Sequence, residues 1–318
     1  MDNKRRAASP LRMPANRVAI LLLGLLCAPS LAAFGIASSS TQSALASGSN
    51  SSALTLAQFA STPRAATGRT LRVLSSGLGS PDDLAVAPNG DIYFGDFSNN
   101  ALNVLRAGAA RPVAVATGLK EPEGIVVARD GALVVAEQGT NRLLEVNPRT
   151  GAKKVLRQLT NNTRKEGVDG LGLDPRTGDI LVPDSPNGRL LRMSRDGTTL
   201  RNIATGFVRP TGAAVEASGS IVVADEFGNA VYRLSTTGRR TVLARVYQPD
   251  DVVVGRDGSI YANSLNGNIW RIDPAGGRAR VLASGLKLPH GLGVAPDGNL
   301  VIAEAGRNTI YKLTLSKP

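Results

Sequence analysis

The chain repeats one sequence pattern six times, and no other feature restricts its fold as strongly. Each copy opens with proline, or with valine in the third copy, and continues into a short apolar run. The copies begin at Pro81, Pro122, Val168, Pro210, Pro249 and Pro289, at intervals of 41, 46, 42, 39 and 40 residues. A nearly constant period of this length is typical of stacked supersecondary units that share one continuous core. It argues against two unrelated domains in this region.

Every copy contains the same succession of short strands. The first strand ends in a glycine turn, such as Asn89-Gly90 or Asp297-Gly298, where glycine accepts a positive φ without a Cβ clash. A second strand follows and ends in a polar residue, and residues 143–146 and 241–244 exemplify the third and fourth strands. Four antiparallel strands per repeat form the blade of a propeller. We therefore predict an all-β fold, a six-bladed β-propeller over residues 69–318.

The two ends of the repeated region predict how the ring closes. The sixth copy stops after its third strand, near Leu315, whereas the region begins with a fourth-strand pattern that has no partner, Thr70-Leu71-Arg72-Val73-Leu74. Residues 69–75 are therefore expected to form the outer strand of the last blade. This pairing joins the ends of the domain and protects a sheet edge that would otherwise be exposed.

The pattern resembles that of NHL repeats. Pro-x-Gly-Ile-x-Val is followed by a strand that ends in Asp or Glu and then by Asn-x-Leu or Asn-x-Ile, most clearly in residues 121–146. The resemblance covers essentially all of residues 69–318. It implies propellers like those of the SMP-30/gluconolactonase, strictosidine-synthase-like and streptogramin-lyase families, and also of non-catalytic sensor domains. The fold alone does not choose among these functions.

Residues 1–46 have the pattern of an export signal. Five basic residues between Lys4 and Arg17 precede the apolar stretch 18–26, and small residues follow. Ala44-Leu45-Ala46 and Ser30-Leu31-Ala32 are candidate cleavage sites. The apolar stretch is short for a membrane span, so we expect a periplasmic or secreted protein without a span in its mature chain. An uncleaved anchor is the alternative.

Residues 47–68 are rich in Ser, Ala and Thr and are expected to form a flexible linker. Composition then excludes several chemistries. The only cysteine, Cys27, excludes a disulfide scaffold, and the only histidine, His290, excludes a multi-histidine zinc site. After residue 67, 31 basic and 24 acidic residues are scattered, without basic runs interleaved with aromatics. We expect a monomer with no nucleic-acid partner, and a general attraction to anionic surfaces.

The repeat places one polar residue of every blade on the same face. The first strand runs away from the Pro motif and the second returns to it, and the first is expected to be innermost. The residues after the Pro position are Asp82, Glu123, Asp169, Thr211, Asp250 and His290. Carboxylates gathered around one axis repel each other and require protons, arginine partners or a cation. Oxygen ligands suit a hard divalent cation such as Ca²⁺ or Mg²⁺. Lining of a solvated channel is an equally weighted alternative.

A second polar set ends the second strands on this face: Asp96, Glu137, Asp184, Asp225, Asn263 and Glu304. An acid here belongs to the repeat pattern itself, so we expect these side chains to accept loop N–H groups. Arg142, Arg189 and Arg307 begin third strands near the same face and are expected to neutralise acids there.

The resemblance has implications for single residues. SMP-30-like hydrolases hold a divalent ion with Glu, Asn and Asp at the position after the turn, which Asp82, Glu123, Asp169 and Asp250 match, but the amide ligands are absent from this position. Streptogramin lyases use histidines in Pro-His motifs, and only Pro289-His290 matches.

We predict a divalent-metal-dependent hydrolase of the SMP-30/lactonase type that acts on a small ester or lactone at the channel mouth. Glu123, Asp169, Asp250 and Asp82 are the predicted metal ligands. Asp250 and His290 are the predicted catalytic residues, with a carboxylate or His290 as general base. One alternative is a non-catalytic NHL-type module that binds a small-molecule or protein ligand at its loop face. The other is a streptogramin-lyase-like carbon–oxygen lyase.

Overall fold

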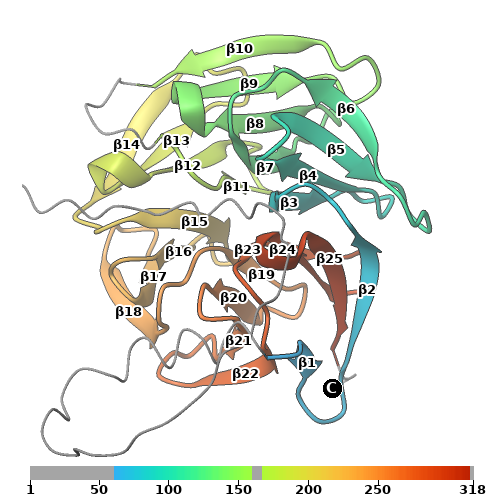
Figure 1. The fold of residues 1–318 in the computed structure, drawn as a ribbon. Coiled ribbons are helices and arrows are strands. Elements are labelled where there is room, and N and C mark those ends of the chain that lie inside the picture. Colours follow the sequence, from blue (N-terminus) through green and yellow to red (C-terminus); the bar gives the residue numbers. More distant parts are fainter. Residues whose placement is uncertain (1–60, 160–166, 316–318) are drawn as a thin grey trace, which may run out of the picture. The chain divides into compact units, whose positions relative to one another are not determined.

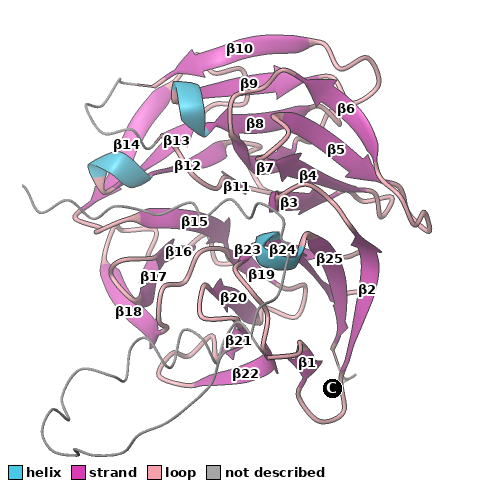
Figure 2. Cartoon of the chain, viewed as in Figure 1, coloured by secondary structure: helices cyan, strands magenta, loops and turns pink. Residues whose placement is uncertain are grey.

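The computed structural model describes residues 61–159 and 167–315, all within one compact unit, Ser49–Pro318. They form 25 β-strands in six sheets arranged as a ring, with three single-turn 3-10 helices (Figures 1 and 2). The predicted all-β six-bladed propeller is confirmed. The predicted export signal with Cys27, and residues 47–60 of the predicted linker, lie outside the described residues. In the two described ranges, no helix has the length and apolar character needed to cross a membrane.

Four sheets follow one another along the chain, each with its first strand at one edge. Blade 1 contains β3 (Pro81–Val86), β4 (Ile92–Asp96), β5 (Ala101–Leu105) and β6 (Val113–Thr117), and blade 2 contains β7 (Pro122–Val127), β8 (Leu133–Glu137), β9 (Arg142–Val146) and β10 (Lys153–Gln158). Blade 3 contains β11 (Gly172–Leu173), β12 (Ile180–Asp184), β13 (Arg189–Met193) and β14 (Leu200–Thr205), and blade 4 contains β15 (Pro210–Val215), β16 (Ile221–Asp225), β17 (Ala230–Leu234) and β18 (Arg240–Arg245).

The last two blades bring the ends of the propeller together. Blade 5 contains β19 (Val252–Val254), β20 (Ile260–Ser264), β21 (Asn268–Ile272) and β22 (Ala279–Ser284), and blade 6 contains β23 (Pro289–Val294), β24 (Leu300–Glu304), β25 (Thr309–Thr314) and β2 (Thr70–Ser76). β2 pairs antiparallel with β25, from Thr70 opposite Thr314 to Ser76 opposite Thr309 (Figure 1). The predicted closure of the ring by residues 69–75 is confirmed.

A short strand precedes this closure. β1 (Arg64–Ala65) pairs with β22 as a fifth strand of blade 5, with Arg64 opposite Ser284. The backbone N–H of Ala66 donates to Leu282 O at 2.8 Å, and the chain then passes to β2 in blade 6. The sequence assigned these residues to the linker, because two strand residues carry no periodicity. The segment fastens blade 5 to blade 6.

The turns explain two recurrent residues of the pattern. The glycines of the six predicted turns, including Gly90 and Gly298, all have positive φ values, between 77° and 89°. Between the second and third strands, Asn100, Asn141 and Asn308 have φ values of 51° to 53°. Asparagine is among the few residues that tolerate this left-handed conformation. The helices η1 (Gln138–Thr140), η2 (Ser185–Asn187) and η3 (Ala305–Arg307) lie in these same connections.

The first strands of blades 3 and 5 begin later than the pattern predicts, at Gly172 and Val252. In blade 5 the side chain of Asn263 accounts for the difference. Its Oδ1 accepts the backbone N–H groups of Asp250 and Asp251 at 3.3 and 2.6 Å. These amides are therefore satisfied by a side chain in place of the strand ladder.

The core is divided among the six interfaces between neighbouring blades. Each interface holds one apolar cluster, formed by side chains that alternate along the strands. At the interface that closes the ring, Phe94 of blade 1 packs with Val301 and Ile310 of blade 6, and Phe94 is fully buried. Stability of the ring therefore depends on contacts between residues about 200 positions apart, whose closure costs chain entropy.

Replacing Phe94 by alanine should lower the free energy of unfolding by about 3–5 kcal/mol, because it removes a fully buried ring and leaves a cavity. Urea unfolding of the full chain measures this change. Val113→Ala, at a side chain that is 55% exposed, is the control and should cost less than about 0.5 kcal/mol. Equal stability of both variants would contradict the closing role of this interface.

Candidate functional site

The residues that follow the Pro positions lie around the central axis. First strands of neighbouring blades contact each other, which places them innermost. We call the six residues Asp82, Glu123, Asp169, Thr211, Asp250 and His290 the axial ring. Its acidic members are buried, whereas the side chain of His290 is 25% exposed. Interactions among these side chains show that the structure brings all five predicted site residues together.

His290 lies between two aspartates from the blades on either side of it. Its Nδ1 is 3.1 Å from Asp250 Oδ2 and 3.9 Å from Asp82 Oδ1. Burial alone would lower the pKa of His290, but the carboxylates of Asp82 and Asp250 outweigh it and raise that pKa to about 10. His290 is therefore a cation at neutral pH. This charge suits a proton donor or an electrostatic stabiliser, and does not suit the predicted general base.

Arg209 supplies a second cation, which the sequence did not predict. Its Nη2 is 2.7 Å from Asp169 Oδ2, and its Nη1 pairs with Glu226. Its guanidinium also lies 5.4 Å from the centre of the Phe227 ring, within the range of a cation–π contact. Burial lowers the pKa of Arg209, but the carboxylates of Asp169 and Glu226 have the larger effect and raise it above its usual value. Arg209 is therefore always charged. The only sequence signal was its place directly before Pro210.

Glu123 and Asp169 form a carboxyl pair. Burial and the charge of Asp169 raise the pKa of Glu123 well above its usual range. Burial also raises the pKa of Asp169, to about 7, although Arg209 opposes the shift. Oε2 of Glu123 is buried and has no hydrogen-bond partner among the described residues. A neutral acid thus lies beside a carboxylate that is held by an arginine.

Asp83 and Asp251 occupy the next position along the first strands. Asp83 accepts the N–H groups of Leu84 at 2.7 Å and of Ile125, in blade 2, at 3.1 Å. Asp251 likewise accepts those of Val252 at 2.7 Å and Leu292, in blade 6, at 2.9 Å. Each carboxylate therefore links two blades. Neither residue was predicted from the sequence, although both stand where the other four copies of the repeat have glycine.

The other four blades have glycine at this position because neighbouring strands approach closely. A Cβ on Gly124 would lie 2.5 Å from the backbone oxygen of Asp169, and one on Gly170 would lie 2.5 Å from that of Thr211. Farther along the axis, a cavity of about 300 Å³ is lined by first strands of all six blades. Its lining is apolar except for Asp83 and Asp251. The ring interior therefore continues as an apolar channel.

The second polar set has the structural role that its sequence pattern predicted. Backbone N–H groups of Ser80, Lys120, Val208 and Lys287 donate to Asp96, Glu137, Asp225 and Glu304. The predicted neutralising arginines are confirmed as well. Arg142 pairs with Glu137 at 2.5 Å, Arg189 with Asp184 at 2.6 Å and Arg307 with Glu304 at 2.5 Å. The hydrogen-bonding capacity of these carboxylates is therefore taken up by loop N–H groups and arginines near the axial ring.

The arrangement of the axial ring does not fit the predicted divalent cation. Arg209 is bonded to Asp169, and His290 lies against Asp250 and Asp82, so two protein cations already supply the positive charge. Within residues 61–159 and 167–315, no group of three or more His, Cys, Asp or Glu side chains is arranged to hold a metal ion. The donor set also lacks the amide ligands that the family resemblance implies.

Comparisons with known proteins agree with this architecture. The family model "Strictosidine synthase-like, N-terminal" matches residues 239–272, which lie in blades 4 and 5. A search of curated protein sequences finds no match. The sequence match therefore covers a small part of the ring.

Solved structures match nearly the whole propeller. A gluconolactonase from Xanthomonas campestris has a TM-score of 0.68 at 17% identity, covering 80% of this chain and 94% of that one. A streptogramin B lyase has a TM-score of 0.61 at 16% identity, covering 78% and 98%. The calcium-binding protein regucalcin from Agrobacterium tumefaciens has 0.66 at 14%, covering 77% and 94%. The chain is thus a six-bladed propeller of the fold that these proteins share, as the repeat pattern predicted.

The stability of the protein should fall as the pH rises from 5 to 8. Burial raises the pKa of Asp83 well above its usual range and that of Asp251 to about 7. The folded state then binds more protons than the unfolded state, so raising the pH favours unfolding, by about 1 kcal/mol or more over this interval. The raised pKa of His290 acts in the same direction.

Urea unfolding at pH 5 and pH 8, in buffers that contain a chelator, measures this dependence. Asp251→Asn should make the dependence shallower, because an amide does not titrate in this range, while Asp83 and His290 still do. Asp130→Asn, at a side chain that is 59% exposed, is the control. A free energy of unfolding that rises with pH would contradict the raised pKa values of Asp83, Asp251 and His290.

Proposed function

We propose that the axial ring is the active site of a hydrolase that acts on a small ester or lactone. The observation that carries this proposal is geometric: two cations, Arg209 and His290, are each held against a carboxylate, at 2.7 Å from Asp169 and 3.1 Å from Asp250. Hydrolysis of an ester needs positive charge for the carbonyl oxygen and acid–base groups for the protons. Both kinds of group lie together at this site.

Each side chain then has a role. Water attacks the acyl carbon while Asp169, oriented by Arg209, accepts the proton of the water. His290, held by Asp250 and Asp82, stabilises the negative charge that develops on the carbonyl oxygen. The bond between the acyl carbon and the leaving oxygen breaks, and Glu123 donates a proton to that oxygen. Acid and alcohol groups are the products, within one molecule if the substrate is a lactone.

Exposed apolar residues near the ring support a substrate with an apolar group. Val208, Phe227, Tyr247 and Leu288 are 63%, 52%, 57% and 40% exposed. All four lie in connections on the Pro-motif face of blades 4 to 6. Leu288 has a φ of 51°, and Glu121 and Gln248 at the same position of their blades also have positive φ, so this conformation belongs to the repeat.

This mechanism needs no resident metal, because Arg209 and His290 provide the charge that the predicted divalent cation would supply. The regucalcin structure is described as that of a calcium-binding protein, so Ca²⁺ and Mg²⁺ belong in the experiment. Rescue by either ion would restore Glu123, Asp169, Asp250 and Asp82 as metal ligands.

Asp169→Asn and Glu123→Gln should each lower kcat for hydrolysis by about 100-fold or more, because each removes a proton-transfer group. The measurement is turnover of a panel of aryl esters and lactones by the full chain, treated with a chelator. Asp297→Asn, on the opposite face of the propeller, is the control and should keep full activity. Activity that survives Asp169→Asn and Glu123→Gln together would refute this site, and recovery above about 10-fold with Ca²⁺ or Mg²⁺ would refute the metal-free mechanism.

A non-catalytic binding module is the second candidate, and the exposed apolar residues around the ring favour it. The same panel separates the two functions. Saturable binding of a substrate at the ring without turnover, lost in Arg209→Met, would establish the module and exclude the hydrolase.

We further propose that residues 1–46 direct export and are removed after Ala46, leaving Ser47 as the first residue. Sequencing the N-terminus of protein recovered from the periplasm or the medium should find Ser47, or Ala33 if the earlier site is used. An intact N-terminus in the membrane fraction would establish the anchor, and intact protein in the cytosol would contradict export.

A further inference from the structure

We propose that the outer surface of blades 5 and 6, at the strand ends opposite the axial ring, docks on an anionic phospholipid bilayer. The proposal does not depend on the proposed hydrolase. We call five arginines there the arginine groove: Arg69, Arg256, Arg271, Arg278 and Arg280. The proposal accounts for an accumulation of positive charge that the fold does not require.

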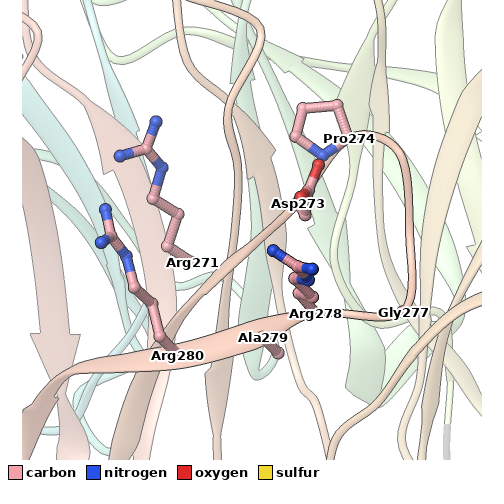
Figure 3. Close-up of a pocket in the computed structure, with 7 residues that line it drawn as sticks. All are labelled: Arg271, Asp273, Pro274, Gly277, Arg278, Ala279 and Arg280. Atoms are coloured by element: carbon pink, nitrogen blue, oxygen red, sulfur yellow. The ribbon is translucent and has the colours of Figure 1, made fainter.

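The groove consists of two adjoining hollows that share Arg271. One hollow, of about 730 Å³, is lined by Arg271, Arg278 and Arg280. The other, of about 240 Å³, is lined by Arg69, Arg256 and Arg271. Figure 3 shows the side chains of Arg271 and Arg280 next to each other and pointing the same way, with Arg278 on the same hairpin. The guanidinium groups are thus spread over a broad surface, which suits a layer of headgroups better than a single small anion.

Strand register places like charges opposite each other in this region. Arg271 on β21 is directly opposite Arg280 on β22, and Arg72 on β2 is directly opposite Lys312 on β25. Like charges in directly opposed positions destabilise an antiparallel pair. Blade 3 has a further pair of this kind, Arg192 opposite Arg201, but Arg192 is held there by Asp174 and Asp179. Among the described residues Arg280 has no such partner, and contact with an anionic surface would relieve its repulsion from Arg271.

Three aspartates line the same two hollows as the five arginines, Asp257, Asp273 and Asp297, and they offset part of this charge. Asp273 accepts the N–H of Ala275, and Asp297 pairs with Lys312. Asp257 binds Ser259 and lies 3.5 Å from Arg271, but its side chain is 59% exposed, so this pair is weak. Among the described residues, no salt bridge involves Arg278 or Arg280. The groove therefore keeps an excess of positive charge.

Other polyanions fit the groove less well. Single-stranded nucleic acid is usually held by exposed aromatic rings that stack on bases, and Tyr261, the aromatic residue that lines the groove, is 3% exposed. A bilayer needs only charge distributed over a surface, since each Lys or Arg close to anionic headgroups contributes independently.

The chain enters the propeller at blade 5, at the end of β22 that is nearer the axial ring, since Arg64 is opposite Ser284. β1 begins at Arg64, on the outer edge of blade 5, and the chain before it carries the apolar stretch 18–26. Firm membrane attachment usually needs two signals, of which a basic surface is one. The groove supplies the electrostatic signal, and it does so whether or not the apolar stretch is retained.

Sedimentation of the full chain with lipid vesicles tests the proposal. The protein should bind vesicles of phosphatidylcholine with phosphatidylglycerol more tightly than vesicles of phosphatidylcholine alone, and added salt should weaken this preference. The triple variant Arg271→Gln, Arg278→Gln, Arg280→Gln should reduce the affinity for the anionic vesicles by about 10-fold or more. Ester or lactone hydrolysis should be unchanged in this variant, which separates the two proposals.

The control is a variant with the same change in net charge elsewhere: Arg111→Gln, Arg149→Gln, Arg201→Gln, at exposed residues of blades 1 to 3. It should bind the anionic vesicles as the unmodified protein does. Equal losses in both triple variants, or equal binding to both kinds of vesicle, would overturn the proposal. Displacement by an equal concentration of free glycerol phosphate would also overturn it, and would instead indicate a site for a soluble anion.

Discussion

The antiparallel pairing of β2 with β25 is the interaction on which the rest of the structure depends. It joins residues from the two ends of the repeated region, and only a closed ring removes the free edges of the first and last blades. Closure also brings blade 6 against blade 1, where Phe94 is buried. The axial ring follows from this closure, because His290 of blade 6 meets Asp82 of blade 1 only when the circle is complete.

Charge compensation at the axis determines what the ring can do. Several buried carboxylates around one axis would be unstable without partners. Here the guanidinium of Arg209 and the imidazolium of His290 compensate part of the negative charge, and the raised pKa of Glu123 keeps a further carboxyl group neutral. Arg209 and His290 lie on different blades and hold different aspartates. The result is a site with fixed positive charges and exchangeable protons, both suited to chemistry at a carbonyl group.

Much of this architecture was predictable from the sequence, because it rests on features that repeat. The positive φ values of Gly90 and Asn141 and the pairing of residues 70–76 all have counterparts in every blade. Features without counterparts were not predictable. Arg209 lies in a loop, and its bond to Asp169 depends on a side-chain conformation that no spacing records. Asp83 was visible as a break in the glycine pattern, but its bond to the next blade required coordinates.

The position of β1 has a mechanical consequence. Tension applied through the chain before residue 61 reaches the propeller first at Ser61, which is hydrogen-bonded to Arg307 and Gly285, and then at Arg64, where two residues pair with β22. This short pairing lies in series with the seven-residue strand β2, so it yields first and absorbs the initial extension. The ladder that completes blade 6 is loaded only afterwards. The pairing of β1 with β22 thus protects the pairing of β2 with β25 from the first part of an applied load.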